Sequence, residues 1–237
     1  MTDTPHPEAS PTTTRWWQTL LRLLFVAGVA YPVTLLWLGL TVRHRERLPL
    51  RGPAIIVANH NSHLDILTLY SLFPLSRVLN VRPAAAADYF LTNRWLAWFA
   101  SHVVGIIPVI RGSASKSVHP LAGCHDALAA GHILILFPEG TRGEPEQLSE
   151  LKSGLWYLAR RYPDIPIVPV FMYGLGRAMA KGQHVPVPFF VDVHVDRPID
   201  WHEDKTHFKT ELQARFHALR RKAAGHGNQG DTHHAPS

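Results

Sequence analysis

The chain has 237 residues, enough for one catalytic domain with an appendage and a sizeable hydrophobic core. Its 24 Lys and Arg outnumber its 18 Asp and Glu, and this basic excess would suit an anionic membrane surface or a nucleic acid. No stretch combines basic residues with interleaved stacking aromatics, so we favour the membrane over a nucleic acid. Cys124 is the only cysteine, which excludes an internal disulfide and is compatible with a reducing compartment.

The N-terminal region predicts a membrane anchor. Residues 1–14 are rich in Thr and Pro, and we expect them to be disordered. A Trp pair then opens an apolar segment, in which the 20 positions Leu23–Val42 carry no charge. That length suits a helix spanning a bilayer. Pro32 favours a kink or a break, so a hairpin of two short helices in one leaflet is an alternative for the anchoring segment, residues 15–47.

Three arginines follow the apolar segment, at positions 43, 45 and 47. Cationic residues next to a membrane segment favour the cytoplasmic side, so we expect the following domain to lie on the cytoplasmic face. The apolar stretch is too long for a cleavable signal peptide, and no Ala-x-Ala site follows it. The arginines and the flanking tryptophans also disfavour a buried core helix of a soluble protein.

Beyond the anchor, apolar runs alternate with amphipathic stretches. We expect strands at residues 54–58, 77–81, 103–110, 133–137, 165–171 and 189–195, and helices at residues 89–102, 117–130, 153–162 and 208–224. This alternation predicts an α/β domain over residues 48–224, with a mostly parallel central sheet flanked by helices. The Gly- and His-rich residues 225–237 are expected to form a disordered tail.

The stretch Asn59-His60-Asn61-Ser62-His63-Leu64-Asp65 lies between a buried strand and the start of a helix. If Ser62 is the N-cap, Asp65 falls at the third helical position, as in a capping box. A carboxylate there reaches back towards the loop that carries His60. Asp65 can then accept from one imidazole nitrogen and leave the other as a base. A helix cap with a surface His is the simpler alternative.

Three later stretches have to be considered together with this one, namely Gly105–Arg111, Phe137–Arg142 and Ile167–Val170. Together with the His-x4-Asp stretch they resemble, in order and spacing, the four blocks of the glycerolipid acyltransferase superfamily. Its best-known members are the 1-acylglycerol-3-phosphate O-acyltransferases. The resemblance covers about residues 50–200, and four blocks in sequence are a far more specific signal than one.

The resemblance implies transfer of an acyl group from acyl-CoA or acyl carrier protein to the free hydroxyl of 1-acylglycerol 3-phosphate, which gives phosphatidate. His60 would be the general base, and Asp65 would fix its tautomer and stabilise the imidazolium. Because an acyl thioester is already activated, no metal or redox cofactor is expected. The partners would be the acyl donor and a membrane lysophospholipid, and no sequence feature bears on oligomeric state.

Arginines near two strand ends predict a phosphate site. Arg111 and Arg142 can each offer two donors to one phosphate. Because α/β sites gather at the carboxyl ends of strands, we expect the two to lie near each other. Lys152 is a possible third phosphate contact, or otherwise a solvated lysine at a helix start.

The Phe137–Arg142 block carries a further expectation from the family, in which it helps to bind the phosphorylated acceptor. This implies substrate-binding roles for Glu139, Gly140 and Thr141 as well as for the arginine. Gly140 permits a tight turn with N–H groups near a polar ligand. Glu139 could also orient a loop arginine through a salt bridge. In the last block, Pro169 interrupts a strand and is expected to shape the acyl pocket.

Rival chemistries use other side chains. Cys124 could form an acyl-cysteine, but the adjacent His125 points away from it on a helix, so a buried structural cysteine is expected. His60, His63 and Asp65 could bind a metal, but their spacing does not match that of dinuclear hydrolases.

Several functions therefore remain alternatives to acylation of 1-acylglycerol 3-phosphate. The acceptor could be glycerol 3-phosphate, a lyso-ornithine lipid or another lipid alcohol. The same dyad could act on water, as in a thioesterase or a lipid hydrolase, and a non-catalytic membrane-binding module is a third possibility. Trp95, Trp98 and Phe99 are interpreted as either core or membrane-facing residues, and their periodicity does not decide between the two.

Overall fold

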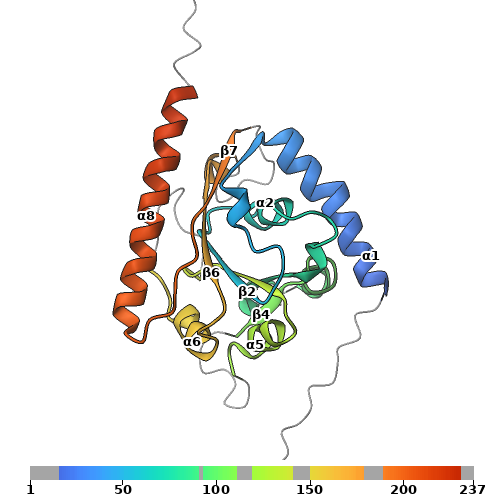
Figure 1. Cartoon of the computed structure of the whole chain (residues 1–237). Coiled ribbons are helices and arrows are strands. Elements are labelled where there is room, and N and C mark those ends of the chain that lie inside the picture. Colours follow the sequence, from blue (N-terminus) through green and yellow to red (C-terminus); the bar gives the residue numbers. More distant parts are fainter. Residues whose placement is uncertain (1–15, 91–92, 111–118, 141–149, 179–188, 231–237) are drawn as a thin grey trace, which may run out of the picture.

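Seven strands form one sheet in the computed structural model, in the order β1-β7-β6-β2-β5-β3-β4 (Figure 1). The structure describes residues 16–90, 93–110, 119–140, 150–178 and 189–230. The strands are β1 (Leu40–Arg43), β2 (Ala54–Ala58), β3 (Val81–Ala86), β4 (Ile107–Val109), β5 (Ile133–Leu136), β6 (Ile167–Tyr173) and β7 (Val191–Val195). β7 runs antiparallel to β6, and the other neighbouring pairs are parallel. The predicted mostly parallel α/β sheet is confirmed.

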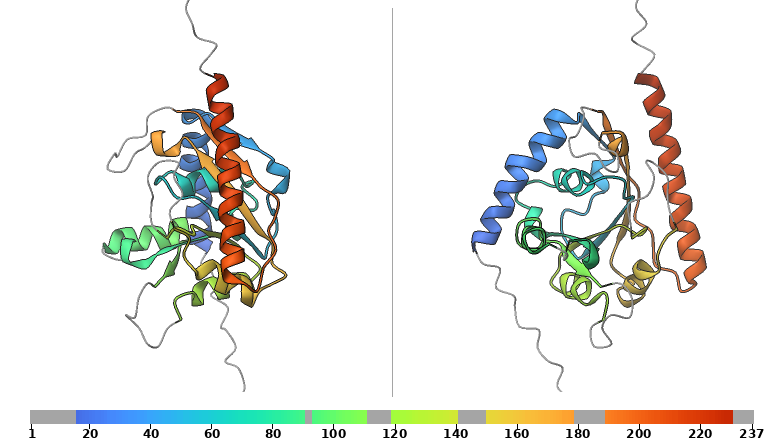
Figure 2. Two further views of the ribbon diagram at one scale, coloured as in Figure 1. Left: turned by 90° about the vertical axis from the view of Figure 1, so that its left-hand side faces the viewer. Right: turned by 180° about the vertical axis from the view of Figure 1, so that it is seen from behind.

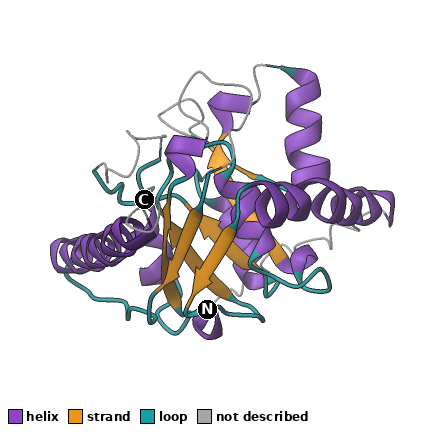
Figure 3. Ribbon diagram, turned by 90° about the horizontal axis from the view of Figure 1, so that it is seen from above, coloured by secondary structure: helices purple, strands orange, loops and turns teal. Residues whose placement is uncertain are grey.

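Helices lie on both faces of this sheet (Figure 3). The α-helices are α1 (Trp16–Phe25), α2 (Asp65–Ser71), α3 (Ala87–Phe90), α4 (Arg94–Phe99), α5 (Ala122–Ala129), α6 (Gly154–Arg161), α7 (Leu175–Ala178) and α8 (Lys205–Gly230). Wider π-helical turns are η1 (Val26–Ala30), η2 (Pro32–Trp37) and η5 (Ala100–Val104), and short 3₁₀ turns are η3 (Arg45–Arg47) and η4 (Val78–Asn80).

The alternation of side chains along each strand divides the core into two parts. In β2, Ile56 points to the face covered by α1 and α2, whereas Ile55 and Val57 point to the face covered by α5, α6 and α8. All three are fully buried. A strand that is buried on both faces has to be apolar throughout, which is why this segment reads as a continuous apolar run.

Several predicted boundaries differ from the structure. The strand predicted at 77–81 is a 3₁₀ turn, and β3 begins at Val81; the run 103–110 is split between η5 and the short β4. The sequence analysis missed β1, which pairs with β7, because its residues continue the apolar composition of the anchor. The C-terminal helix was predicted to end at 224 but continues to Gly230.

Helices α1, η1 and η2 form one continuous helix, so Pro32 neither breaks it nor turns it into a hairpin (Figures 1 and 2). Wide turns flank the proline: the Tyr31 N–H donates to the carbonyl of Val26, and the Leu38 N–H donates to the carbonyl of Val33. A helix whose backbone hydrogen bonds join residues five positions apart makes wider turns than an α-helix. The missing proline N–H is accommodated there without a sharp kink.

The wide turns also keep one row of side chains against the domain. Residues four apart rotate by about 40° in an α-helix, so such a row would drift off its partner within a few turns. Here a row at this spacing stays buried along the whole helix, and its members are Arg22, Val26, Ala30, Thr34 and Leu38. The anchoring segment therefore lies lengthwise on the domain.

Polar contacts fix this helix at both ends. Arg22 Nε donates to the carbonyl of Val103 in η5 (3.3 Å), and the Thr34 hydroxyl donates to the Ser71 hydroxyl at the end of α2 (2.6 Å). The Tyr31 hydroxyl donates to the carbonyl of Phe73 (2.6 Å). The helix Trp16–Trp37 contains an 18-residue window with a mean hydropathy of 1.8, so it is long and apolar enough to cross a membrane, but it is bound to the domain over its length.

Candidate active site

The carboxyl ends of β2 and β5 lie side by side because these strands pair in parallel, with Val57 opposite Leu136. The loops that follow both strands therefore meet at one edge of the sheet. Asn59, directly after β2, fixes its loop to β6: its side chain accepts from the Met172 N–H (2.7 Å) and donates to the Met172 carbonyl (2.9 Å). These two hydrogen bonds continue the pairing of β2 with β6 by one residue, with the Asn59 side chain in place of backbone groups. They fix the direction in which the next residue leaves the sheet.

His60 and Asp65 form the dyad that the sequence predicted. His60 Nδ1 lies 2.8 Å from Asp65 Oδ2, and the Asp65 side chain is completely buried. The same oxygen accepts from the backbone N–H groups of Asn61 (2.7 Å) and Ser62 (3.0 Å). Three donors converge on one carboxylate oxygen, so the imidazole and its loop are positioned together.

The start of α2 agrees with the predicted capping box in the contact made by the Asp65 carboxylate, but not in the position of the helix start. The Asp65 carboxylate reaches back to the Ser62 N–H as expected, but α2 begins at Asp65 itself. The Ser62 hydroxyl accepts from the Leu64 N–H (3.2 Å), within the loop. The carboxylate therefore holds the loop, and the simple cap with a surface His is not what is observed.

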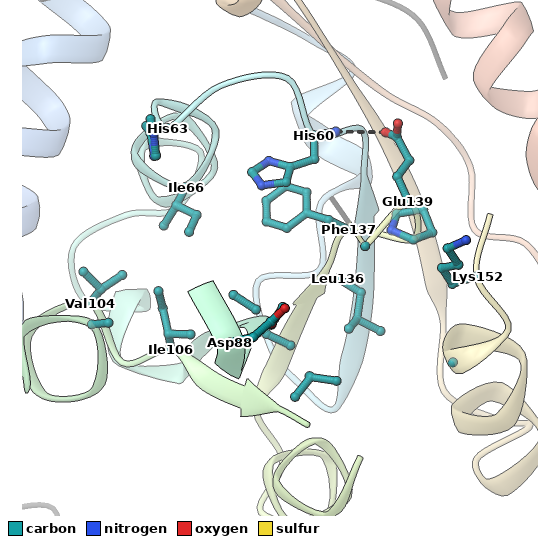
Figure 4. Close-up of a pocket in the computed structure, with 18 of the residues that line it drawn as sticks. His60, His63, Ile66, Asp88, Val104, Ile106, Leu136, Phe137, Glu139 and Lys152 are labelled. Carbon is teal, nitrogen blue, oxygen red and sulfur yellow. Dashed lines mark hydrogen bonds between the residues drawn. The ribbon is translucent and has the colours of Figure 1, made fainter. Parts of the chain in front are cut away.

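The loop after β5 contacts His60 on two sides, with Phe137 below its imidazole and Glu139 to its right in the view of Figure 4. The Phe137 ring stacks on the imidazole with a centroid separation of 4.2 Å and an interplanar angle of 25°. Glu139 Oε1 accepts from the backbone N–H of His60 (3.0 Å), and Glu139 is only 1% exposed. Glu139 thus positions the histidine, a role that the sequence analysis missed because these residues are 79 positions apart.

His60 lines a cavity of about 1030 Å³ whose other walls are mostly apolar. The walls come from β3, α4, η5 and β4, and they include Ala84, Ala85, Leu96, Phe99, Val104 and Ile106. Lys152 and Glu139 line the same cavity near the His60 end (Figure 4). The cavity therefore has a polar end at the dyad, and its other end is mostly apolar, with Asp88 as a charged exception.

The remaining predicted site residues divide into two groups. Gly140 has a φ of 73° and donates its N–H to the Phe137 carbonyl (3.0 Å), which confirms the tight turn but occupies that N–H within it. Lys152 is tied by its backbone N–H to the Pro138 carbonyl (2.7 Å), and its ammonium lies 3.5 Å from Glu150. Arg111, Thr141 and Arg142 lie outside the described residues, so their convergence on a phosphate stays a prediction.

Two rival interpretations lose support. Cys124 is fully buried, and burial raises the pKa of its thiol to about 12, so it is poorly suited to nucleophilic attack. Among the described residues, no group of three or more His, Cys, Asp or Glu side chains could hold a metal ion. His63 lines the cavity but lies apart from His60 (Figure 4).

Residues 39–173, more than half of the chain, match the sequence model of the acyltransferase family. The chain belongs to the acyltransferase family. The matched range contains the dyad, the loop after β5 and all of β6, so the family assignment covers the whole polar end of the cavity.

Similar proteins agree with this assignment. The 1-acyl-sn-glycerol-3-phosphate acyltransferase of Chlamydomonas reinhardtii is 34% identical over 144 residues, which cover 60% of this chain and 41% of the relative. The yeast 1-acyl-sn-glycerol-3-phosphate acyltransferase is 33% identical over 145 residues, which cover 59% and 45%. This acyltransferase spans less than half the length of these curated relatives.

A solved structure shares the fold. The crystal structure of the 1-acyl-sn-glycerophosphate (LPA) acyltransferase PlsC from Thermotoga maritima superposes with a TM-score of 0.68 and 20% sequence identity. The superposition covers 90% of this chain and 84% of that one. The acyltransferase fold described above is therefore shared over nearly the whole chain, including segments outside the family match.

Proposed function

We propose that this acyltransferase moves an acyl group from an acyl thioester, acyl-CoA or acyl carrier protein, to the free hydroxyl of 1-acylglycerol 3-phosphate, giving phosphatidate and a free thiol. The observation that carries this proposal is the position of the His60–Asp65 dyad in the wall of a large apolar cavity. The relatives named above are 1-acyl-sn-glycerol-3-phosphate acyltransferases, which supports this choice of acceptor.

In the proposed mechanism, Asp65 holds the Nδ1–H of the imidazole, and Nε2 takes the proton from the acceptor hydroxyl. The hydroxyl oxygen forms the new ester bond with the thioester carbonyl carbon, and the carbon–sulfur bond then breaks. His60 returns its proton to the departing thiolate. Because the acceptor hydroxyl itself attacks, no acyl-enzyme forms and no metal or redox cofactor is required.

The cavity suits the two substrates in different ways. Its apolar walls would hold an acyl chain, which gains binding free energy by leaving water. Its polar end has Lys152. Arg111 and Arg142 lie outside the described residues, and the sequence predicts that they also bind the acceptor phosphate. We propose Arg111, Arg142 and Lys152 as these phosphate contacts, because a phosphate needs cations near the attacking hydroxyl.

Membrane association is part of the proposed function. The apolar helix Trp16–Trp37 exposes Leu24 (59%) and Leu36 (84%), as expected for a helix in contact with lipid. We propose that the catalytic domain lies on the cytoplasmic face. The arginines behind this proposal also serve the fold: Arg45 donates to the Leu72 carbonyl and Arg47 to the Val195 carbonyl.

Release of free thiol tests the reaction and its acceptor together. Purified protein in detergent micelles is given labelled acyl-CoA with 1-acylglycerol 3-phosphate, with glycerol 3-phosphate, or with no acceptor. We expect release that depends on the first acceptor, with labelled phosphatidate as product. Equal release without acceptor would instead identify a thioesterase, and release with glycerol 3-phosphate alone would move the proposal to that acceptor.

A further inference from the structure

Two arginines meet beside Gly105, where helix η5 ends. Gly105 has a φ of 77°, and a Cβ added there would lie 1.7 Å from Nη2 of Arg22, so this guanidinium lies directly on the Gly105 backbone. Strands β3 and β4 are parallel, with Ala84 opposite Ile107. Counting back two residues from this pair brings Arg82 level with Gly105. Arg22 of the anchoring helix and Arg82 of the sheet therefore converge on the same glycine.

His132 completes a cluster with these arginines. It directly precedes β5, whose Ile133 pairs with Val81, the residue before Arg82. Burial, and then the charges of Arg82 and Arg22, lower the pKa of His132. Burial, and then the charge of Arg22, lower the pKa of Arg82. The three side chains are therefore close enough to feel one another's charge, and we call Arg22, Arg82 and His132 the amino-edge cluster, because it lies at the amino ends of β3 and β5.

Protein groups offset little of the positive charge of this cluster. Arg22 is only 5% exposed, and its Nε donates to the carbonyl of Val103 at the end of η5 (3.3 Å). The Tyr70 hydroxyl already donates to the next carbonyl, that of Val104. The carboxyl end of a helix carries about half a negative charge, which offsets about a quarter of the charge of two guanidiniums. Among the residues that the structure describes, no carboxylate forms an ion pair with a member of the cluster. Because a buried cation without a counter-charge is unfavourable, we expect an anion there.

The opposite side of the sheet provides an internal reference. Arg43 in β1 lies 3.6 Å from Asp192, and Arg47 and Arg215 lie 3.9 Å and 3.5 Å from the buried Asp196. Each of these arginines is accompanied by a carboxylate of the same chain. The fold therefore supplies counter-charges to the arginines beside β7, whereas the described part of the chain supplies none to the amino-edge cluster.

The chemistry and the position of the cluster indicate which anion it would take. Guanidiniums bind oxyanions through pairs of N–H groups, and two of them from different segments suit a tetrahedral group with several oxygens, such as phosphate, better than a planar carboxylate. Arg82 and His132 are partly exposed, so a phosphate can reach them from solvent. His132 is five residues before Phe137, which stacks on His60. At about 3.3 Å per residue, the cluster lies roughly 16 Å from the dyad.

We propose that Arg22, Arg82 and His132 bind a phosphate group at the amino edge of the sheet, either free phosphate or the headgroup phosphate of an anionic phospholipid. This site is separate from the acceptor phosphate at the dyad. Arg22 belongs to the anchoring helix, and Gly105 follows Val104, which lines the cavity. A bound phosphate would therefore link the anchoring helix to the cavity wall. The inference does not depend on the proposed reaction, because no step of that reaction uses these three residues.

Thermal unfolding with two kinds of probe tests this site. Full-length protein in uncharged detergent micelles is titrated with inorganic phosphate at constant ionic strength. In a second series, without inorganic phosphate, phosphatidylglycerol or phosphatidylcholine is added to the micelles. Arg82→Gln removes one member of the cluster. Arg197→Gln is the matched control, because Arg197 is an exposed arginine just after β7, which is separated from β3 by three strands.

We expect the wild type and Arg197→Gln to be stabilised by inorganic phosphate or by phosphatidylglycerol, and Arg82→Gln to gain no stability from either. A probe at ten times its dissociation constant raises the ratio of folded to unfolded protein about elevenfold. Stabilisation by phosphate alone would identify free phosphate as the ligand, and stabilisation by phosphatidylglycerol beyond that by phosphatidylcholine would identify the lipid headgroup.

Three results would overturn the proposal. The first is a wild type that neither phosphate nor phosphatidylglycerol stabilises. The second is equal stabilisation of the wild type and Arg82→Gln, because the phosphate group would then bind elsewhere, as at the dyad. The third is an equal response to the two lipids without any response to phosphate, which would be an effect of lipid in general.

A measurement on the wild type covers the case in which Arg82→Gln does not fold. Phenylglyoxal modifies accessible arginines, and mass spectrometry measures the extent of modification at each position. The probe that stabilises the protein should reduce the modification of Arg82 several-fold and leave that of Arg197 unchanged. Equal modification of Arg82 with and without the probe would overturn the proposal.

Discussion

The two ends of the cavity are built in different ways. At the polar end, directed hydrogen bonds hold His60: Asp65, five positions along the chain, bonds its imidazole, and Glu139, 79 positions away, accepts from its backbone N–H. At the apolar end, small and branched side chains such as Ala85 and Ile106 enclose space by packing alone. Loss of one hydrogen bond is a discrete event, whereas packing changes are graded. Substitutions at the polar end should therefore abolish function, and those at the apolar end should retune it.

The largest effect is expected from His60→Ala. Removal of a general base lowers turnover by about 10²–10⁴-fold. The side chain is 21% exposed and its backbone contact with Glu139 does not need the imidazole, so the fold should survive. Labelled phosphatidate formation and circular dichroism on the same sample check both parts. Loss of secondary structure in the variant would leave the catalytic assignment without support.

Asp65→Asn should follow, with a loss of about 10²–10⁴-fold in turnover, because the amide cannot hold the same imidazole tautomer and stabilise its cation. Asp65→Ala should in addition destabilise the fold. It leaves the buried N–H groups of Asn61 and Ser62 without their acceptor, at about 1–3 kcal/mol for each. Chemical denaturation, which measures the free energy of unfolding, distinguishes the two variants. Equal free energies would mean that the N–H groups of the loop find other acceptors.

These two residues show how much of the polar end the sequence could predict. His60 and Asp65 are five positions apart on a strand-to-helix turn, so local geometry was enough to pair them. Glu139 and Phe137 meet His60 only because β2 and β5 are neighbours in the sheet, which no local pattern specifies. The predicted site therefore contained Glu139 with a substrate-binding role, and its contact with the His60 backbone became visible only in the fold.

The same reasoning applies to the scaffold. Buried strands such as β2 and β5 were predicted nearly to the residue because both faces demand apolar side chains. β1 was missed because Leu40 and Val42 look like the end of the apolar helix before them. The sequence left open whether that helix continues past Pro32 or forms a hairpin, since wide turns depend on how a helix docks and not on its composition.

Glu139 offers a sharper comparison within the polar end. Glu139→Gln keeps an oxygen that can accept from the His60 N–H, whereas Glu139→Ala removes this acceptor of a part-buried N–H. We expect the Gln variant to keep most of its kcat and the Ala variant to lose about tenfold, which corresponds to about 1.4 kcal/mol of positioning. If Gln were as inactive as Ala, the negative charge itself would be required, as in a direct contact with substrate or with a loop arginine.

At the apolar end, Ala85→Phe should change selectivity instead of abolishing activity. Ala85 lines the cavity and is partly buried, so a larger side chain would fill space that an acyl chain occupies. Each excluded methylene weakens binding by about 0.8 kcal/mol. Competition between donors of different chain length should show a preference shifted by several fold towards shorter chains. An unchanged preference would place the acyl chain elsewhere in the cavity.

The smallest effect on activity is expected at Cys124, and Cys124→Ser should keep the kcat of the wild type. Burial raises the pKa of the thiol from an ordinary value near 9.0 to about 12. Between these values the unfolded chain releases the proton while the folded chain retains it, so stability falls as the pH rises through this window. The free energy of unfolding should therefore fall less steeply above pH 9 in Cys124→Ser than in the wild type. Equal slopes would contradict this.

The pH dependence of kcat/KM tests the central claim most directly, namely that His60 is the base. In the wild type we expect the rate to rise with pH and reach a plateau, because a general base must be unprotonated to accept the proton of the acceptor hydroxyl. The residual activity of His60→Ala should lack this limb. The same ascending limb in His60→Ala would show that another group is the titrating base, and would contradict the mechanism.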